Sequence, residues 1–259
     1  MRVFCIVLSL GVLGVSGPVD AEDDLQELLE RTAKQVSAYV DVISKMTCTE
    51  RVIQLKLDAA GKTVATKESS FDYLILLNPV GSDLELAESR LPIPSKRGAK
   101  KEPPPLLLSN GLSLLFLVFH PYYAPGFEYS LGEKETLAGR QYSTIRFRHI
   151  RGTRSPAALA LRGREYLLDV DGMALIDPDS GSIVRIVAGL DGDMTDIGLR
   201  KFLSVIDYTL VPFQAEPPRW LPSQVVVDVE SRHQHWRNIH EFSQYKQFGV
   251  ATSEQVKIP

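Results

Sequence analysis

The sequence predicts an α+β fold in which one long N-terminal helix precedes an antiparallel β-sheet built as a meander. Two observations carry this prediction. Hydrophobic residues recur with a helical period over residues 24–44, and from Thr47 onward the period changes to two residues. Short turns rich in Gly and Asp separate the alternating segments, without the strand–helix–strand alternation that a parallel sheet needs.

The first 21 residues are typical of a secretory signal peptide. Arg2 and the amino terminus form a short positive region, residues 3–15 are apolar except for Ser9, and Val-Asp-Ala at 19–21 precedes a predicted cleavage site before Glu22. The apolar run is shorter than the ~20 residues that span a bilayer. A buried N-terminal helix is the alternative. The signal-peptide interpretation predicts a mature chain that is periplasmic or secreted.

The composition favours a single domain over residues 22–259. Removing 21 residues from 259 leaves 238, which suits one β domain. The whole chain is 44% hydrophobic, which argues against disorder, and its net charge of -3 gives no sign of a nucleic-acid partner. Cys48 is the one cysteine after the leader, so no internal disulfide is expected. It is either a buried small hydrophobe or a reactive or intermolecular thiol.

Residues 24–44 are predicted to form the long helix. Asp23 or Asp24 can cap its N-terminus, where acidic side chains also suit the positive end of the helix dipole. Charged residues occupy one face of this helix. The other face is apolar and consists of Leu25, Leu28, Leu29, Val36, Tyr39, Val40 and Ile43.

Ten segments are predicted as strands, and at least seven of them are expected in one antiparallel sheet. They are residues 51–57, 63–77, 126–131, 141–150, 164–170, 173–176, 183–190, 202–211, 223–232 and 239–248. Residues typical of tight turns lie between several of these strands, at 137–140, 171–172, 177–181 and 191–193.

Residues 93–120 interrupt the meander. The first part, 93–105, carries four cations and four prolines and is predicted to be an exposed, mobile loop. The second part, 106–119, is almost wholly apolar, and Asn110 can cap a short helix there that ends before Pro121. This helix is either core packed against a sheet face or a lid that fills a cavity and can leave it.

The candidate ligand-binding residues belong to this apolar segment and to the aromatic residues that follow it. Apolar and aromatic side chains line most ligand pockets, and the same side chains also make ordinary core. Both interpretations stay open for this set. The set is Leu114, Leu115, Phe116, Phe119, Tyr122, Tyr123, Phe127 and Tyr129.

No motif in the sequence indicates an enzyme, a metal or a cofactor. A nucleophile elbow, a Gly-rich phosphate loop and a paired Cys or His signature are all lacking. The Asp-rich turns do not match a calcium loop. His233 and His235 would share one face of a strand and His240 could return on its neighbour, which leaves open a metal site or a polar outer face.

Three segments are similar to a known family. Residues 73–76 resemble its early strand, residues 172–186 its strand–turn–strand with an Asp-Pro-x-x-Gly turn, and residues 245–248 its closing strand. With the leader and the interrupted meander, they resemble the periplasmic lipoprotein-carrier superfamily, whose members include LolA, LolB and RseB. The resemblance implies a strongly curved, open half-barrel whose concave face is covered by the N-terminal helix and the short apolar helix. The insert at 93–119 is longer than in the lipoprotein chaperone.

The resemblance implies an exported, periplasmic binding protein for a hydrophobic ligand such as an acyl chain, a lipid or a lipoprotein. An envelope protein and transient contact with a membrane are further expected partners. The alternative is a structural or sensory envelope domain without a small ligand. An envelope hydrolase is a third hypothesis, which a convergent cluster of ionisable groups with perturbed pKa would favour.

Overall fold

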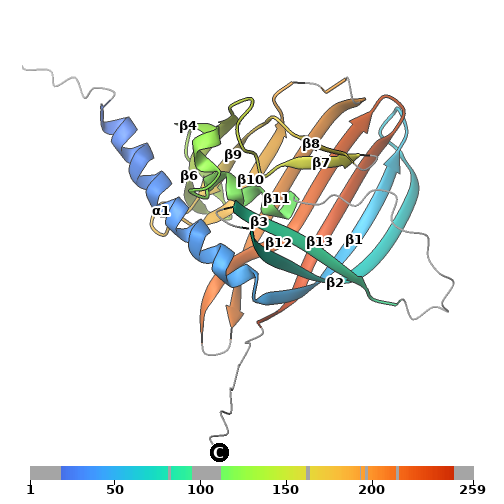
Figure 1. Ribbon diagram of the computed structural model, residues 1–259, viewed down its shortest axis with the longest axis horizontal. Helices are drawn as coiled ribbons and strands as arrows, with labels where there is room; N and C mark the ends of the chain where they lie inside the picture. Colours follow the sequence, from blue (N-terminus) through green and yellow to red (C-terminus); the bar gives the residue numbers. More distant parts are fainter. Residues whose placement is uncertain are drawn as a thin grey trace, which may run out of the picture.

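A computed structural model describes residues 19–80, 83–94, 112–161, 164–192, 194–195, 198–213 and 216–247. Its main feature is an 11-stranded antiparallel sheet that curves without closing into a barrel (Figure 1). Neighbouring strands follow the order β3-β2-β1-β13-β12-β11-β10-β9-β6-β4, and β5 pairs with β6. The predicted open half-barrel is confirmed.

The strands vary widely in length, and the longest lie in the middle and at one side of the sheet. They are β1 (Met46–Leu57), β2 (Thr63–Val80), β3 (Asp83–Pro92), β4 (Phe127–Leu131), β5 (Glu135–Leu137), β6 (Arg140–His149), β7 (Ala158–Leu161), β8 (Arg164–Leu167), β9 (Val170–Ile176), β10 (Ile183–Leu190), β11 (Leu199–Phe213), β12 (Glu216–Ser231) and β13 (His235–Gln247). Strands β7 and β8 form a separate two-stranded sheet. Strand β13 pairs with β1, so the first and last strands of the chain are neighbours inside the main sheet.

Helix α1 (Val19–Ile43) covers one end of the concave face. It begins five residues before the predicted helix and therefore includes residues 19–21, which precede the predicted cleavage site. Leu28, Val36, Val40 and Ile43 are buried, as the helical period predicts. Cleavage itself stays a prediction, because residues 1–18 lie outside the described part of the chain.

The predicted apolar helix is a 3-10 helix, η1 (Leu112–Phe119), and not an α-helix. It lies between α1 and the strands, against β10 and β12 (Figure 1). A second 3-10 turn, η2 (Ala124–Gly126), leads into β4. Of the predicted mobile loop, residues 93 and 94 are exposed, and residues 95–105 lie outside the described residues, as do 106–111.

Three strands and one turn differ from the prediction. Strands β3, β5 and β7 were not predicted. β3 was missed because two of its inward positions, Glu88 and Arg90, are charged. The predicted turn at 171–172 is wrong, because Gly172 lies inside β9, where a Cβ atom would come within 2.2 Å of the Val187 carbonyl oxygen. The turn at 137–140 is confirmed, with Ala138 and Gly139 at φ of 50° and 82°.

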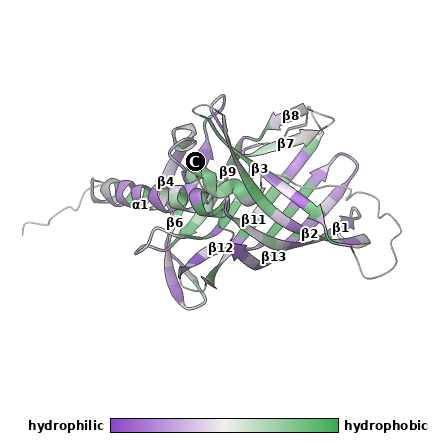
Figure 2. Cartoon of the chain, turned by 60° about the horizontal axis from the view of Figure 1, so that its bottom comes forward, coloured by the Kyte–Doolittle hydropathy of each residue, from purple (hydrophilic) through white to green (hydrophobic). Residues whose placement is uncertain are grey.

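The concave face changes from apolar to polar along a single row of paired residues that crosses nine strands. The row runs Tyr129, Phe147, Gly172, Ala188, Ser204, Val227, Asn238, Gln54 and Lys67. Figure 2 shows hydrophobic residues gathered where α1 and η1 meet the sheet. Among the described residues, no helix is both long and apolar enough to cross a membrane.

Candidate functional site

The η1 segment is packed as core. Every residue from Leu114 to Phe119 is at most 4% exposed, and Leu115 is 0% exposed. The Phe119 ring lies 5.7 Å from that of Tyr129 and 5.8 Å from that of Phe147. Phe116 makes an edge contact with Tyr39 of α1, with ring centroids 4.7 Å apart. Helix α1, η1 and the sheet therefore form one continuous apolar layer.

The structure brings seven of the eight predicted ligand-binding residues into this layer. Leu114, Leu115, Phe116, Phe119 and Phe127 are buried in it, and Tyr123 and Tyr129 pack against it half-buried. Tyr122 is outside this layer but makes an edge contact with Tyr123, with ring centroids 4.9 Å apart, and the guanidinium of Arg154 lies 4.5 Å from its ring. Whether these residues contact a ligand stays a prediction.

A cavity of about 250 Å³ opens beside η1. Its inner wall is apolar, with Val36 of α1, Phe116 of η1 and Ile183 of β10. Its rim includes exposed residues of α1 and of the β12 start, Gln35 and Pro217 among them, so the cavity reaches solvent between these two elements. The remaining lining residues are Ala38, Tyr39, Ser182, Tyr208, Pro218, Arg219 and Trp220.

The sequence analysis identified only part of this cavity. Phe116 was in the predicted set, and Val36 and Tyr39 were on the predicted apolar face of the helix. Tyr208 and Trp220 carried no signal as site residues, because only the pairing of β11 with β12 places both of them opposite α1. Strand pairing of this kind cannot be read from local periodicity.

A buried ionic cluster occupies the polar side of the concave face. The Arg90 guanidinium contacts both carboxylate oxygens of Glu50, at 2.6 and 3.0 Å, and donates to Glu88 at 3.0 Å. His240 Nδ1 lies 2.8 Å from Glu50 Oε1, and the Tyr73 hydroxyl donates to Glu88 at 2.8 Å. The side chains of Glu50, Glu88 and Arg90 are 0%, 2% and 8% exposed.

This cluster contains a carboxylate that stays ionised. Burial by itself raises the pKa of Glu50, but the hydrogen bonds and charges of His240 and Arg90 outweigh burial, and the pKa is lowered. Glu50 is therefore an acceptor with both oxygens engaged, and it has no proton to deliver near neutral pH. The cluster joins β1, β3 and β13 and therefore ties the edge strand β3 to the first and last strands of the sheet.

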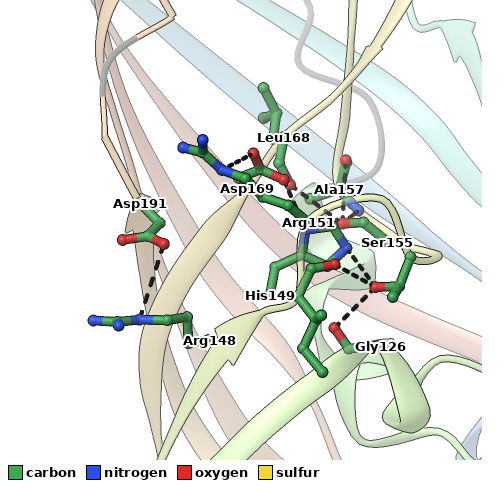
Figure 3. Close-up of polar contacts among 11 residues, drawn as sticks. Gly126, Arg148, His149, Arg151, Ser155, Ala157, Leu168, Asp169 and Asp191 are labelled. Atoms are coloured by element: carbon green, nitrogen blue, oxygen red, sulfur yellow. Dashed lines mark hydrogen bonds and ion pairs between the residues drawn. The ribbon is translucent and has the colours of Figure 1, made fainter.

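A second cluster has the connectivity of a catalytic triad. Thr153 Oγ1 lies 3.2 Å from His149 Nε2. His149 Nδ1 lies 2.9 Å from Asp169 (Figure 3). However, the Thr153 hydroxyl lies 2.6 Å from the carbonyl oxygen of Ile150 and 3.2 Å from that of Gly126. A hydroxyl donates one proton, and its shortest acceptor here is a backbone carbonyl. The geometry is that of a loop anchor and not of a nucleophile activated by a histidine.

The three histidines discussed as metal ligands are separated. His233 lies in the turn before β13, so it does not share a strand face with His235, and that expectation is wrong. His235 Nε2 lies 2.6 Å from Asp228, whereas His240 is buried against Glu50 on the other face. Within the described ranges, no group of three or more His, Cys, Asp or Glu residues could hold a metal ion.

Cys48 is 5% exposed on the inner face of β1. Burial, followed by the nearby charge of Glu50, raises the pKa of its thiol to about 12. The thiolate is the reactive form, so this cysteine is unreactive near neutral pH. The structure favours the interpretation of Cys48 as a buried small hydrophobe.

No family model and no curated protein matches the chain. Several solved structures are similar to it, and three of them are described here. A LolA superfamily protein from Nitrosomonas europaea is 9% identical, with a TM-score of 0.40 over 87% of this chain and 94% of its own. A DUF1329 family protein from Desulfovibrio piger is 13% identical, with a TM-score of 0.45 over 89% and 95%. A putative outer membrane lipoprotein-sorting protein domain from Vibrio parahaemolyticus is 7% identical, with a TM-score of 0.42 over 88% and 95%.

Proposed function

We propose that this chain is an exported binding protein for a hydrophobic ligand, such as an acyl chain, a lipid or a lipoprotein, in the cell envelope. The observation that carries the proposal is the cavity beside η1, which has an apolar inner wall and reaches solvent between α1 and β12. Ligand pockets commonly combine an apolar lining with a few polar groups at defined positions. The predicted signal peptide supports an envelope location.

The size of the cavity limits what it can hold. Pockets that enclose a whole drug-sized molecule measure roughly 300–1,000 Å³, and this cavity measures about 250 Å³. We propose that it takes one hydrocarbon chain of the ligand, with the remainder outside between α1 and β12. In this arrangement η1 is a fixed wall of the cavity, and its Phe116 contacts the chain.

The proposal is tested by filling the cavity. The mature chain from Glu22 is titrated with N-phenylnaphthylamine, whose fluorescence rises in an apolar site. Val36 lines the cavity and is 3% exposed, so Val36→Phe should place a ring in the cavity and weaken probe binding about tenfold or more, which is ~1.4 kcal/mol. The matched control is Val64→Phe on β2, where Val64 is 57% exposed and the change should leave binding unaltered.

Two results would contradict the proposal. If the wild-type chain takes up no hydrophobic probe, the structural or sensory domain becomes the better interpretation, and the complete burial of Leu114–Phe119 already fits that alternative. If Val36→Phe binds the probe as well as the wild type while remaining folded, the ligand site lies elsewhere. We propose binding and not catalysis, because the hydroxyl of Thr153 and the carboxylates of the buried cluster are held by other groups.

A further inference from the structure

A two-stranded ribbon extends from the main sheet beside the cavity. Strand β11 pairs with β10 as far as Asp207, and β12 pairs with β13 as far as Gln224. Beyond these two residues, segment 208–213 of β11 and segment 216–222 of β12 pair with each other and with no other strand that the structure describes. We call the two segments the β11–β12 ribbon. Figure 1 shows it in orange, projecting past the end of the sheet.

The base of the ribbon is fixed in the fold. Tyr208 and Leu221 are buried there, and Tyr208 belongs to the apolar core. The Tyr245 hydroxyl of β13 donates a hydrogen bond to the Pro222 carbonyl oxygen at 2.6 Å. The ribbon therefore keeps a defined position next to the cavity.

The outer part of the ribbon presents apolar side chains to solvent. Leu210 is 48% exposed and lies directly opposite Trp220, so the two side chains share one face of the ribbon. Pro212, Pro217 and Pro218 are exposed as well. An apolar surface that stays in contact with water commonly marks a site where a protein or a membrane binds. The exposed face is therefore a candidate interaction surface.

The ribbon also forms one wall of the cavity. The lining residues that it contributes are Tyr208, Pro217, Pro218, Arg219 and Trp220. Because Trp220 lies both in this wall and opposite Leu210, the exposed apolar face continues into the mouth of the cavity. A hydrocarbon chain that reached the mouth through water would expose each of its methylenes, at a cost in free energy. Contact between this face and the source of the chain removes that cost.

The composition of the ribbon favours a lipid bilayer over a protein strand as its partner. Proline has no N–H to donate, and four prolines, one on β11 and three on β12, interrupt the hydrogen-bonding edges that a strand from another protein or a second copy would need. Glu216 and Arg219 are the charged residues of the ribbon, and their charges cancel. Tryptophan is favoured at the boundary between lipid and water, because its ring is apolar and its N–H is polar. Each of these properties suits a neutral lipid surface.

We infer that the β11–β12 ribbon docks on a lipid bilayer through the face around Leu210, with Trp220 and the cavity mouth at the acyl chains. This inference rests on the proposed binding function and adds the partner with which the cavity exchanges its ligand. A hydrocarbon chain then passes between the bilayer and the cavity without crossing water. Because the ribbon carries no net charge, docking depends on apolar contact and does not require anionic lipids.

Cosedimentation with vesicles tests the inference. The exported protein is mixed with vesicles of phosphatidylcholine, at low and at high salt, and we expect it to bind at both. Leu210→Glu should weaken this binding about tenfold or more, because a charge replaces the apolar contact. Leu167→Glu on β8 is the matched control, since Leu167 is 52% exposed and belongs to the separate β7–β8 sheet. It should leave vesicle binding unaltered, and both variants should melt with the wild type.

Tryptophan fluorescence locates the docked face. The chain has two tryptophans, and in Trp236→Phe only Trp220 remains. Phosphatidylcholine that is brominated on its acyl chains should quench the fluorescence of this variant, because bromine quenches tryptophan at short range. Adding Leu210→Glu should remove most of the quenching. A Trp220 that is not quenched while the protein is bound to vesicles would overturn the proposed orientation.

Three results would overturn the inference as a whole. The first is no binding of the wild type to phosphatidylcholine vesicles, which is expected if the ribbon binds a protein instead. The second is binding that needs added phosphatidylglycerol and disappears at high salt. The third is equal weakening by Leu210→Glu and Leu167→Glu. None of them affects uptake of N-phenylnaphthylamine by the wild type, whose failure is the separate result that would contradict the proposed function.

Discussion

Replacement of Leu115 tests whether η1 is core or a lid. Leu115 is 0% exposed within the layer formed by α1, η1 and the sheet. Truncating such a leucine to alanine costs ~2–5 kcal/mol, from lost burial and from the cavity left behind. We expect Leu115→Ala to lower the free energy of unfolding by ~3 kcal/mol, because the Leu115 side chain is surrounded on all sides. At ~2–4 °C per kcal/mol for a domain of this size, the melting temperature of Leu115→Ala should fall by about 10 °C.

Leu115→Asp makes the test sharper. In a fixed core it buries an unpaired charge, and we expect the variant to lose cooperative folding. Thermal unfolding followed by circular dichroism measures both variants. Leu210, which is 48% exposed on β11, supplies the control, and Leu210→Ala should change stability by less than ~0.5 kcal/mol. A Leu115→Asp protein that melts within a few degrees of the wild type, but no longer takes up ligand, would refute the core interpretation and support the lid.

Three further predictions concern the buried cluster and the leader. Arg90→Met should lower the free energy of unfolding, measured by urea titration, by ~3–5 kcal/mol, because it leaves Glu50 and Glu88 buried without their cation. A loss below ~1 kcal/mol would contradict the structural role of the cluster. The folded pKa of Glu50 is lowered, so its contribution to stability is complete above the unfolded value of about 4.3 and is lost as pH falls through the folded value. The melting temperature should therefore fall as the pH is lowered into the acid range. The fall should be less steep in Glu50→Gln than in Glu128→Gln, the exposed control. Parallel plots of melting temperature against pH for these two variants would contradict this prediction. Intact mass of the exported protein should begin at Glu22, and retention of the leader would disprove cleavage there.

Local patterns in the sequence were sufficient for much of the fold. The spacing of Leu28, Val36 and Val40 predicted the buried face of α1, because a helical period places these side chains on one side. Two-residue alternation located most strands of the antiparallel sheet, because successive side chains of a strand point to opposite faces. Strand β3 was not predicted because Glu88 and Arg90 point inward as an ion pair. Charged residues at buried positions do not produce the alternation of apolar and polar residues that identifies a strand.

The apolar run at residues 114–119 predicted burial against the sheet, as core or as a closed lid, because apolar surface is removed from water wherever the fold permits. The sequence also placed Val36 and Tyr39 on the inner side of their helix. What surrounds these residues follows from strand pairing between segments far apart in the chain. The pairing of β11 with β12 brings Tyr208 and Trp220 opposite α1, where both line the cavity. Periodicity reports which side of an element is buried, whereas the composition of a site depends on which distant elements meet there.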